Sequence, residues 1–252
     1  MYLFLFAFIL VYGSMHLYAF FKARAAFAFG LGPTIILAFF LVSMVLAPIA
    51  VRLLGRHGLH QIARFVAYFG YAWMGLLFYF VWIGLCLDLV SLFMRFLAFI
   101  SGSHSGGLLW GARKTFGLLV LSTFVLGLWS TFSAWHIRLD RLTLEAAKLP
   151  VQEDRLIIVQ ISDLHLGLMV GKGRLTRIMD LVKQSQPDIV VCTGDLVDAQ
   201  TDRLDYLAGM LAELRPPRGK FAVLGNHEVY SGIGRSERFL PSTRCWSLTI
   251  ST

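Results

Sequence analysis

The sequence is poor in cysteine, and its first half nearly lacks acidic residues. Only three cysteines occur in 252 residues, Cys86, Cys192 and Cys245. Their odd number and wide spacing exclude a disulfide framework and a CxxC metal motif. Residues 1–136 contain one acid, Asp88, against eight Lys and Arg, so most of the net charge of +8 lies in this half. Basic charge beside long apolar runs is typical of membrane-flanking segments, and it gives no support to nucleic acid as a main partner.

Charged residues are scarce throughout, and apolar residues are abundant. The chain is 57% hydrophobic and 15% charged, which is too apolar for a wholly soluble protein. Four apolar runs approach or exceed the roughly 20 residues that a membrane-spanning helix needs. These predicted spans cover residues 1–21, 31–51, 65–87 and 116–135. We therefore expect a multi-pass protein of the cell membrane, with the lipid bilayer as a partner and with residues 1–136 as its membrane region.

Two features of the predicted membrane region are left open. Lys and Arg are nearly balanced between its two sides, so the orientation and the side of the following domain are not predicted. Residues 88–100 carry Asp88 and Arg95, which we expect on an interfacial helix as solvated charges; the alternative is a buried intramembrane pair. The histidines of this region have no carboxylate or cysteine partner at ligand spacing, so we assign no role to His16, His57, His60 or His104.

The pattern changes after residue 136. Residues 137–154 mix charges and are predicted to be a linker. Short β-branched runs follow, separated by apolar residues at helical spacing. The predicted strands are residues 156–162, 188–193 and 220–224. Strands that are apolar on both faces and alternate with helices predict an α/β domain with a buried sheet over residues 155–252.

Polar side chains follow each predicted strand directly. Asp163 and His165 come after the first strand, Asp195 after the second, and Asn226 and His227 after the third. The carboxyl ends of neighbouring strands are where open α/β sheets bind ligands. We expect Asp163 and His165, two apart in an extended segment, to project to the same side. Carboxylate, amide and imidazole groups that converge there predict a divalent metal site, in which the two oxygens of Asp195 can bridge two ions.

Each of these motifs has a simpler explanation when taken alone. An aspartate after a strand often caps a helix, and GD and GN are common turn pairs. Asp198 is explained equally well as a helix cap, and His227 alone could be an ordinary loop histidine. Three such clusters in order, each directly after a strand, are hard to produce by turn chemistry. Their combination favours the metal site.

The segments DLH, GDLVD and GNHE resemble the first three sequence blocks of the calcineurin-like metallophosphoesterases. The apolar first half is also similar to the membrane-anchored branch of that superfamily. The resemblance covers about residues 155–235 and implies an α+β sandwich-type fold. It also implies a site with two divalent ions (Mn, Fe or Zn, sometimes Mg) that cleaves a phosphoester.

By motif, the resemblance also implies a role for each candidate residue. Asp163 and His165 would hold the first ion, Asp195 would bridge the two, and Asn226 would bind the second. His227 would face the phosphate, as a transition-state stabiliser or as a proton donor to the leaving group. The expected activity is hydrolysis of phosphodiester or pyrophosphate bonds by a two-metal hydroxide mechanism. Its most specific expected substrate is lipid-linked, such as UDP-2,3-diacylglucosamine.

One departure from the family pattern weakens this expectation. The remaining family ligands are histidines in later blocks, and no histidine follows His227 in this chain. We therefore expect weak metal binding and slow or absent turnover, in a domain that is incomplete at its C-terminal end. Residues 235–252 have no clear periodicity, and we interpret them as the product of a truncation or a frameshift that leaves out the later strands. The alternative function is a catalytically impaired homologue that acts as a membrane scaffold or binding protein.

Overall fold

The computed structural model describes residues 2–102, 111–145, 155–167, 170–196, 204–226 and 243–247. The chain divides into two compact units, Met1–His136 and Ile137–Thr252. In its described residues the first unit consists of helices, whereas the second combines a parallel sheet with two helices.

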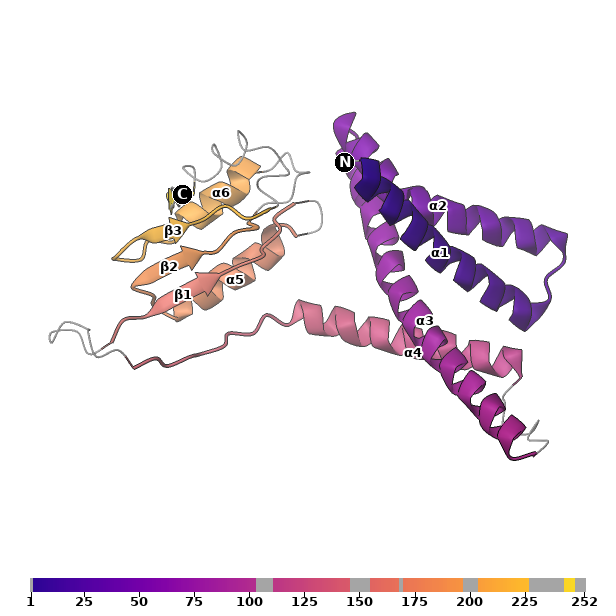
Figure 1. Ribbon diagram of the computed structural model, residues 1–252. Helices are drawn as coiled ribbons and strands as arrows, with labels where there is room; N and C mark the ends of the chain where they lie inside the picture. The colour runs from indigo at the N-terminus through magenta and orange to yellow at the C-terminus, as the bar shows by residue number, and fades with distance from the viewer. Residues whose placement is uncertain are drawn as a thin grey trace. The chain divides into compact units, whose positions relative to one another are not determined.

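The first unit is built around one long helix (Figure 1). Its elements are α1 (Tyr2–Phe27), α2 (Leu31–Arg56), α3 (His60–Ile100) and α4 (Ala112–Trp135). The other three helices all pack against α3. The buried residues of α3 recur at intervals of three, four or seven and are mostly small: Ala63, Ala67, Gly70, Leu77, Val81 and Gly84. Small residues on one helix face allow backbones to approach closely, as in membrane helix packing.

The four helices are long and apolar enough to cross a membrane. At most 22% of the apolar segment of each is buried within the structure, so most of their apolar side chains are at least partly exposed. Exposure of so large an apolar surface to water is unfavourable, and a lipid bilayer would cover that surface. Each helix covers one predicted span, α1 from Tyr2 onward, and extends beyond it at one end or both. The predicted apolar helices are therefore present, and their crossing of a membrane stays a prediction.

The prediction of a separate interfacial helix over residues 88–100 is wrong. These residues continue α3 to Ile100 without a break, since the segment contains no glycine or proline to end the helix. Asp88 is not simply solvated: its carboxylate forms an ion pair with Lys22 of α1 and accepts a hydrogen bond of 2.8 Å from the Tyr18 hydroxyl. The other predicted partner, Arg95, is exposed. The acidic side chain of α3 is therefore paired with a lysine of α1.

The second unit contains a parallel sheet with strand order β1-β2-β3-β4. Its elements in chain order are β1 (Ile158–Ile161), α5 (Lys172–Gln184), β2 (Ile189–Cys192), α6 (Leu204–Ala212), β3 (Lys220–Ala222) and β4 (Trp246–Ser247). All three strand pairs are parallel. The three predicted strands and the two predicted helices between them are present, each strand being shorter than predicted.

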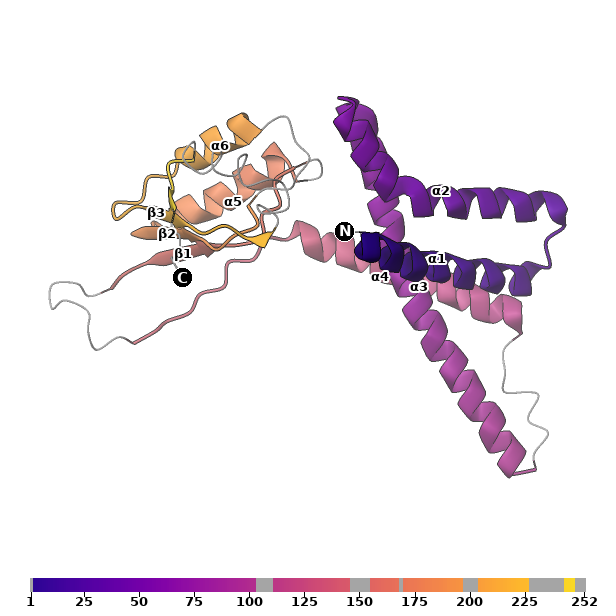
Figure 2. The ribbon, with the colours of Figure 1, turned by 45° about the horizontal axis from the view of Figure 1, so that its top comes forward.

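Both helices cover the same face of this sheet (Figure 2). The core joins alternate strand residues to the apolar sides of α5 and α6: Val159, Ile161, Val190, Cys192 and Ala222 with Leu175, Met179, Val182, Leu207 and Leu211. The prediction of strands buried on both faces is wrong for β1, where Ile158 is 55% exposed. The residues of β2 and β3 on that face, Ile189, Val191 and Phe221, are half-buried. α5 connects β1 to β2, and α6 connects β2 to β3, so both connections proceed in the same direction along the sheet. Connections between parallel strands are right-handed as a rule, and two that proceed in one direction place their helices on the same face.

The short strand β4 was not predicted. Trp246 and Ser247 extend the sheet beyond β3, opposite Phe221 and Ala222. The free edge of β3 offers backbone hydrogen-bonding groups that a passing segment of any composition can use. The prediction of a tail without later strands is therefore wrong for these two residues, and most of the tail lies outside the described residues.

Candidate metal centre

The loops that follow β1 and β2 continue to run beside each other after the strands have ended. The Asp163 N–H donates to the Gly194 carbonyl at 3.3 Å, and the His165 N–H donates to the Asp195 carbonyl at 2.9 Å. These bonds extend the pairing of two parallel strands past their carboxyl ends. The first three candidate ligands are thereby held side by side by backbone contacts.

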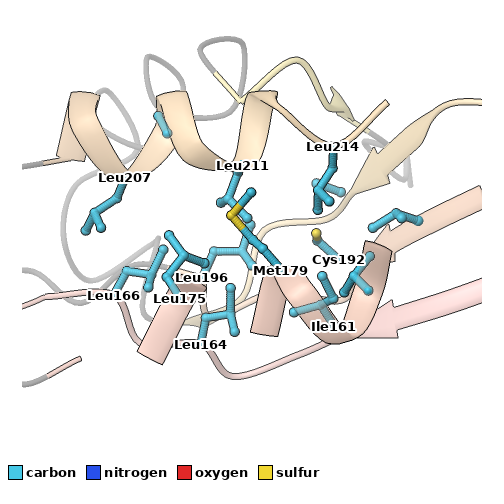
Figure 3. Packing of buried hydrophobic residues seen from close by; sticks show 14 of the residues in the cluster. Ile161, Leu164, Leu166, Leu175, Met179, Cys192, Leu196, Leu207, Leu211 and Leu214 are labelled. Atoms are coloured by element: carbon cyan, nitrogen blue, oxygen red, sulfur yellow. The ribbon is translucent and has the colours of Figure 1, made fainter. Parts of the chain in front are cut away.

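Leucines between the ligands determine which way the loops face. Leu164 and Leu166 are 6% and 0% exposed, and Leu196 is 1% exposed. Figure 3 shows these leucines in the core with the apolar side chains of α5 and α6. Because the leucines occupy the core, Asp163 and His165 are left on the outer side of the loop, where both are at least partly exposed.

The backbone of the candidate ligands is strained. Asp163, His165 and Asp195 have φ values of 55°, 45° and 53°, in the left-handed region that disfavours residues other than glycine. Each such residue costs roughly 1–3 kcal/mol, and such strain is concentrated at functional sites. Asp163 and His165 do converge, but not by alternation in an extended segment as predicted. β1 ends at Ile161, and left-handed turns bring the two side chains together.

Three side chains converge closely enough to bind one ion. A ligand atom from each of Asp163, His165 and Asp195 lies within 4.8 Å of the others. His165 Nε2 is 3.8 Å from Asp163 Oδ1. Two atoms bound to one ion at about 2.0–2.2 Å can lie about 4 Å apart, so only a small contraction is needed. Two carboxylates and an imidazole suit Mn, Fe or Zn, and the residues therefore fit a divalent ion.

Asn226 joins the cluster through Asp195. One terminal atom of the Asn226 amide lies 2.9 Å and 3.2 Å from the two carboxylate oxygens of Asp195. If that atom is the amide nitrogen, it donates two hydrogen bonds. If it is the amide oxygen, three oxygens meet at one point, which is the arrangement that a shared cation stabilises.

Two glycines allow this approach. A Cβ on Gly194, whose φ is +101°, would lie 2.8 Å from the Cα of Gly225. A Cβ on Gly225 would lie 2.5 Å from the backbone nitrogen of Asp195 and would collide with its carboxylate. The loops after β2 and β3 therefore touch backbone to backbone, and only glycine fits at either position.

Ser162 is a residue that the sequence analysis missed. Its hydroxyl donates a hydrogen bond of 2.5 Å to Asp163 Oδ2 and so orients the first carboxylate. Hydrogen bonds to ligating carboxylates tune metal sites in this way. The only sign of it in the sequence is a hydroxyl residue directly before the first ligand.

Two residues that the sequence analysis singled out, His227 and Asp198, lie outside the described residues. Their predicted roles stay predictions. Within the described part, Asp163, His165 and Asp195 could form one ion position, and Asp195 with Asn226 could contribute to a second.

Comparison with known proteins agrees with this geometry. Residues 156–247 match the calcineurin-like phosphoesterase family. An uncharacterized metallophosphoesterase of Aquifex aeolicus is 45% identical over 116 residues, which are 46% of this chain and 44% of that protein. A transmembrane protein with metallophosphoesterase domain of Danio rerio is 42% identical over 84 residues, which are 33% of this chain and 19% of that protein.

A third relative carries a more specific name. The UDP-2,3-diacylglucosamine pyrophosphatase LpxG of Chlamydia trachomatis is 36% identical over 100 residues, which are 39% of this chain and 30% of that protein. The chain thus spans less than half the length of each of these relatives. No solved structure matches the chain. On these matches, residues 156–247 are similar to the calcineurin-like phosphoesterase family.

Proposed function

We propose that the protein is a membrane-anchored, metal-dependent phosphoesterase that hydrolyses phosphodiester or pyrophosphate bonds. The observation that supports this most directly is the convergence of Asp163, His165 and Asp195, joined by Asn226, at the carboxyl edge of a parallel sheet. Three of these residues have left-handed backbones, and the loops that carry Asp195 and Asn226 touch at two glycines. Ordinary turn residues do not require this strain and close approach, which therefore favours a functional site.

Each residue has a distinct part in this proposal. Asp163 and His165 would hold one divalent ion (Mn, Fe, Zn or Mg) together with Asp195, and Asp195 with Asn226 would contribute to holding a second. When bound, such ions supply Lewis-acid and nucleophile-activating chemistry for phosphoester cleavage. His227, the next residue after Asn226, donates a proton to the leaving oxygen or stabilises the charge that develops on the phosphate. The neutral amide of Asn226 keeps the excess negative charge of the site low, which favours approach of an anionic phosphate.

The proposed substrate class is a phosphoester or pyrophosphate at the membrane surface, including a lipid-linked one such as UDP-2,3-diacylglucosamine. Two observations support it. Among its described residues the chain carries four helices that are long and apolar enough to span a membrane. One of its relatives is named for cleavage of that pyrophosphate.

The activity is tested on the full chain in membranes with bis(p-nitrophenyl) phosphate and Mn²⁺. Asp195→Asn removes the charge of the bridging carboxylate, and we expect the metal-dependent rate to fall at least about 10²-fold. The matched control is Asp180→Asn, which removes an exposed carboxylate from α5 and should leave the rate unchanged. A rate that does not depend on Mn²⁺, or that survives Asp195→Asn, would contradict the phosphoesterase and favour a binding or scaffold function.

The substrate class is tested separately. Release of UMP is measured from UDP-2,3-diacylglucosamine in mixed micelles and from soluble UDP-N-acetylglucosamine, with the Asp195→Asn variant as the blank. We expect preference for the acylated substrate, because the apolar helices hold the protein at the surface where that substrate lies. Equal rates on both substrates, with metal-dependent activity retained, would reject the lipid-linked class while leaving the phosphoesterase standing.

A further inference from the structure

One cation of the second unit lies on an aromatic ring instead of beside an acid. Lys172, the first residue of α5, is exposed, and the first turn of α5 contains no acidic residue. Its ammonium lies over the ring of Tyr206, 5.5 Å from the ring centroid. Among the described residues, no carboxylate forms an ion pair with Lys172. A ring attracts an ammonium without cancelling its charge, so this cation can still attract an anion.

The chain path places Lys172 beside the loop that carries the first two candidate ligands. Leu166, which directly follows His165, forms an isolated bridge with Val170, and the Gly167 N–H donates to the Val170 carbonyl at 3.1 Å. Lys172 is two residues beyond Val170. One strand spacing and two residues of chain put the Lys172 backbone at most about 13 Å from Leu166. Its flexible four-carbon stem lets the ammonium cover much of that distance.

Tyr206 lies at the same edge of the domain. It belongs to α6, which follows β2 and the loop after that strand. Figure 3 shows Leu175 of α5 and Leu207 of α6 at the same end of the core as Leu166. Lys172 is three residues before Leu175, and Tyr206 directly precedes Leu207. Their contact therefore joins the first turns of two helices at the edge where the candidate ligands lie.

The charges at this edge suit a substrate with two adjacent phosphates. Two divalent ions bring more positive charge than the carboxylates of Asp163 and Asp195 neutralise, and the phosphate that is cleaved takes up that excess. The second phosphate of a pyrophosphate carries a further negative charge, which needs a cation beyond the two ions. Lysine binds phosphate as a compact point charge. Lys172 is such a cation, and no carboxylate of the described residues competes for it.

We infer that Lys172 binds the phosphate adjacent to the one that is cleaved, and that it thereby favours pyrophosphates over substrates with a single phosphate. The ring of Tyr206 holds the free ammonium near the centre, which reduces the conformational entropy lost when the long side chain binds substrate. Because Lys172 acts on the substrate of the proposed phosphoesterase, its role rests on that function. It decides between the two bond types that the proposed function includes.

Binding is tested by isothermal titration of the full chain in micelles loaded with Mn²⁺. Methylenebisphosphonate carries two phosphoryl groups and is not hydrolysed, whereas methylphosphonate carries one. We expect Lys172→Met to weaken binding of the first probe at least about fivefold and to change the second less than about twofold. The matched control is Arg177→Met, which removes an exposed cation farther along α5 and should weaken neither. Titration of Asp195→Asn gives the heat of probe binding to free Mn²⁺.

Kinetics on the same protein give a second readout. UDP-N-acetylglucosamine contains a pyrophosphate, and bis(p-nitrophenyl) phosphate contains one phosphate. Lys172→Met should raise KM for the first substrate at least about fivefold, with its kcat and the KM for the second unchanged. Lys172→Arg keeps the charge and Tyr206→Phe keeps the ring, so both variants should retain the KM of the wild type.

Three results would overturn this role. Equal effects of Lys172→Met on both probes, or an effect on neither, would show that Lys172 does not recognise a second phosphate, while Mn²⁺-dependent hydrolysis by the wild type would leave the phosphoesterase standing. Loss of Mn²⁺ affinity in Lys172→Met would mean that the lysine supports the centre instead of binding substrate. If the wild type binds neither probe and shows no Mn²⁺-dependent hydrolysis, the phosphoesterase fails, and the role of Lys172 fails with it.

Discussion

Asp195 takes part in more of the candidate centre than any other described residue. Its carbonyl accepts the His165 N–H, its carboxylate meets the amide of Asn226, and its backbone leaves no room for a side chain on Gly225. It does this from a left-handed backbone conformation. The centre therefore depends as much on a tight backbone turn as on the ligand atoms themselves.

At the residue scale we predict that Gly225→Ala disrupts the centre. The new Cβ would push against the backbone nitrogen and carboxylate of Asp195, so the loops after β2 and β3 must separate. We expect Mn²⁺ affinity, measured by isothermal titration of the full chain in micelles, to fall at least about tenfold, or about 1.4 kcal/mol. The control is Gly173→Ala in α5, where a Cβ meets nothing within 4 Å and affinity should be unchanged. Unchanged affinity in Gly225→Ala would mean that the close approach is not needed.

At the scale of elements, α3 is distinguished by its length and by one carboxylate. It continues for 41 residues, and its carboxylate Asp88 pairs with Lys22 of α1 while Tyr18 donates to it. Among long apolar helices, a single polar contact fixes how one helix lies along another, since apolar contacts alone allow sliding.

The contact between α1 and α3 can be tested by removing its charges in turn. We predict that Lys22→Met leaves Asp88 without its ion-pair partner and destabilises the helical unit by roughly 1 kcal/mol, a modest value because both side chains are partly exposed. The double variant Lys22→Met with Asp88→Asn should recover part of that loss. Stability is followed by SDS unfolding with circular dichroism. Arg24→Met, which removes an exposed charge from the same helix, is the control. Equal losses in the single and double variants would show that the ion pair contributes nothing.

At the scale of the molecule, the candidate metal ligands and the long apolar helices belong to different units. The described candidate ligands all lie in the second unit, and the long apolar helices all lie in the first. A ligand that binds only the folded form of one unit stabilises that unit by about 2.7 kcal/mol at a concentration 100 times its Kd.

We therefore predict that metal acts on one unfolding transition only. In calorimetry of the full chain in micelles, Mn²⁺ should raise the transition of the second unit relative to EDTA and leave that of the helical unit in place. Titration should show one tighter and one weaker site. The second position has only Asp195 and Asn226 among the described residues, with no imidazole to complete it. Two equally tight sites would reject this ligand assignment, and a shift of the helical transition would place the metal elsewhere.

The sequence was sufficient for those features that depend on local composition. Long runs of apolar residues predicted four helices, and the strand-to-loop pattern located Asp163, His165, Asp195 and Asn226 at strand ends. The family motifs were also recognisable, and the match over residues 156–247 confirms that recognition. Hydrophobic length and periodicity carry this information because they act over neighbouring residues.

The tertiary structure decided what depends on contacts between distant residues. It paired Asp88 with Lys22, left Ile158 of β1 exposed, and placed Trp246 beside Phe221. It also brought Asp163 and His165 together through left-handed turns that no alternation rule describes. A side chain's partner is set by the packing of whole elements, and residues far apart in the sequence give no local sign of which of them will meet.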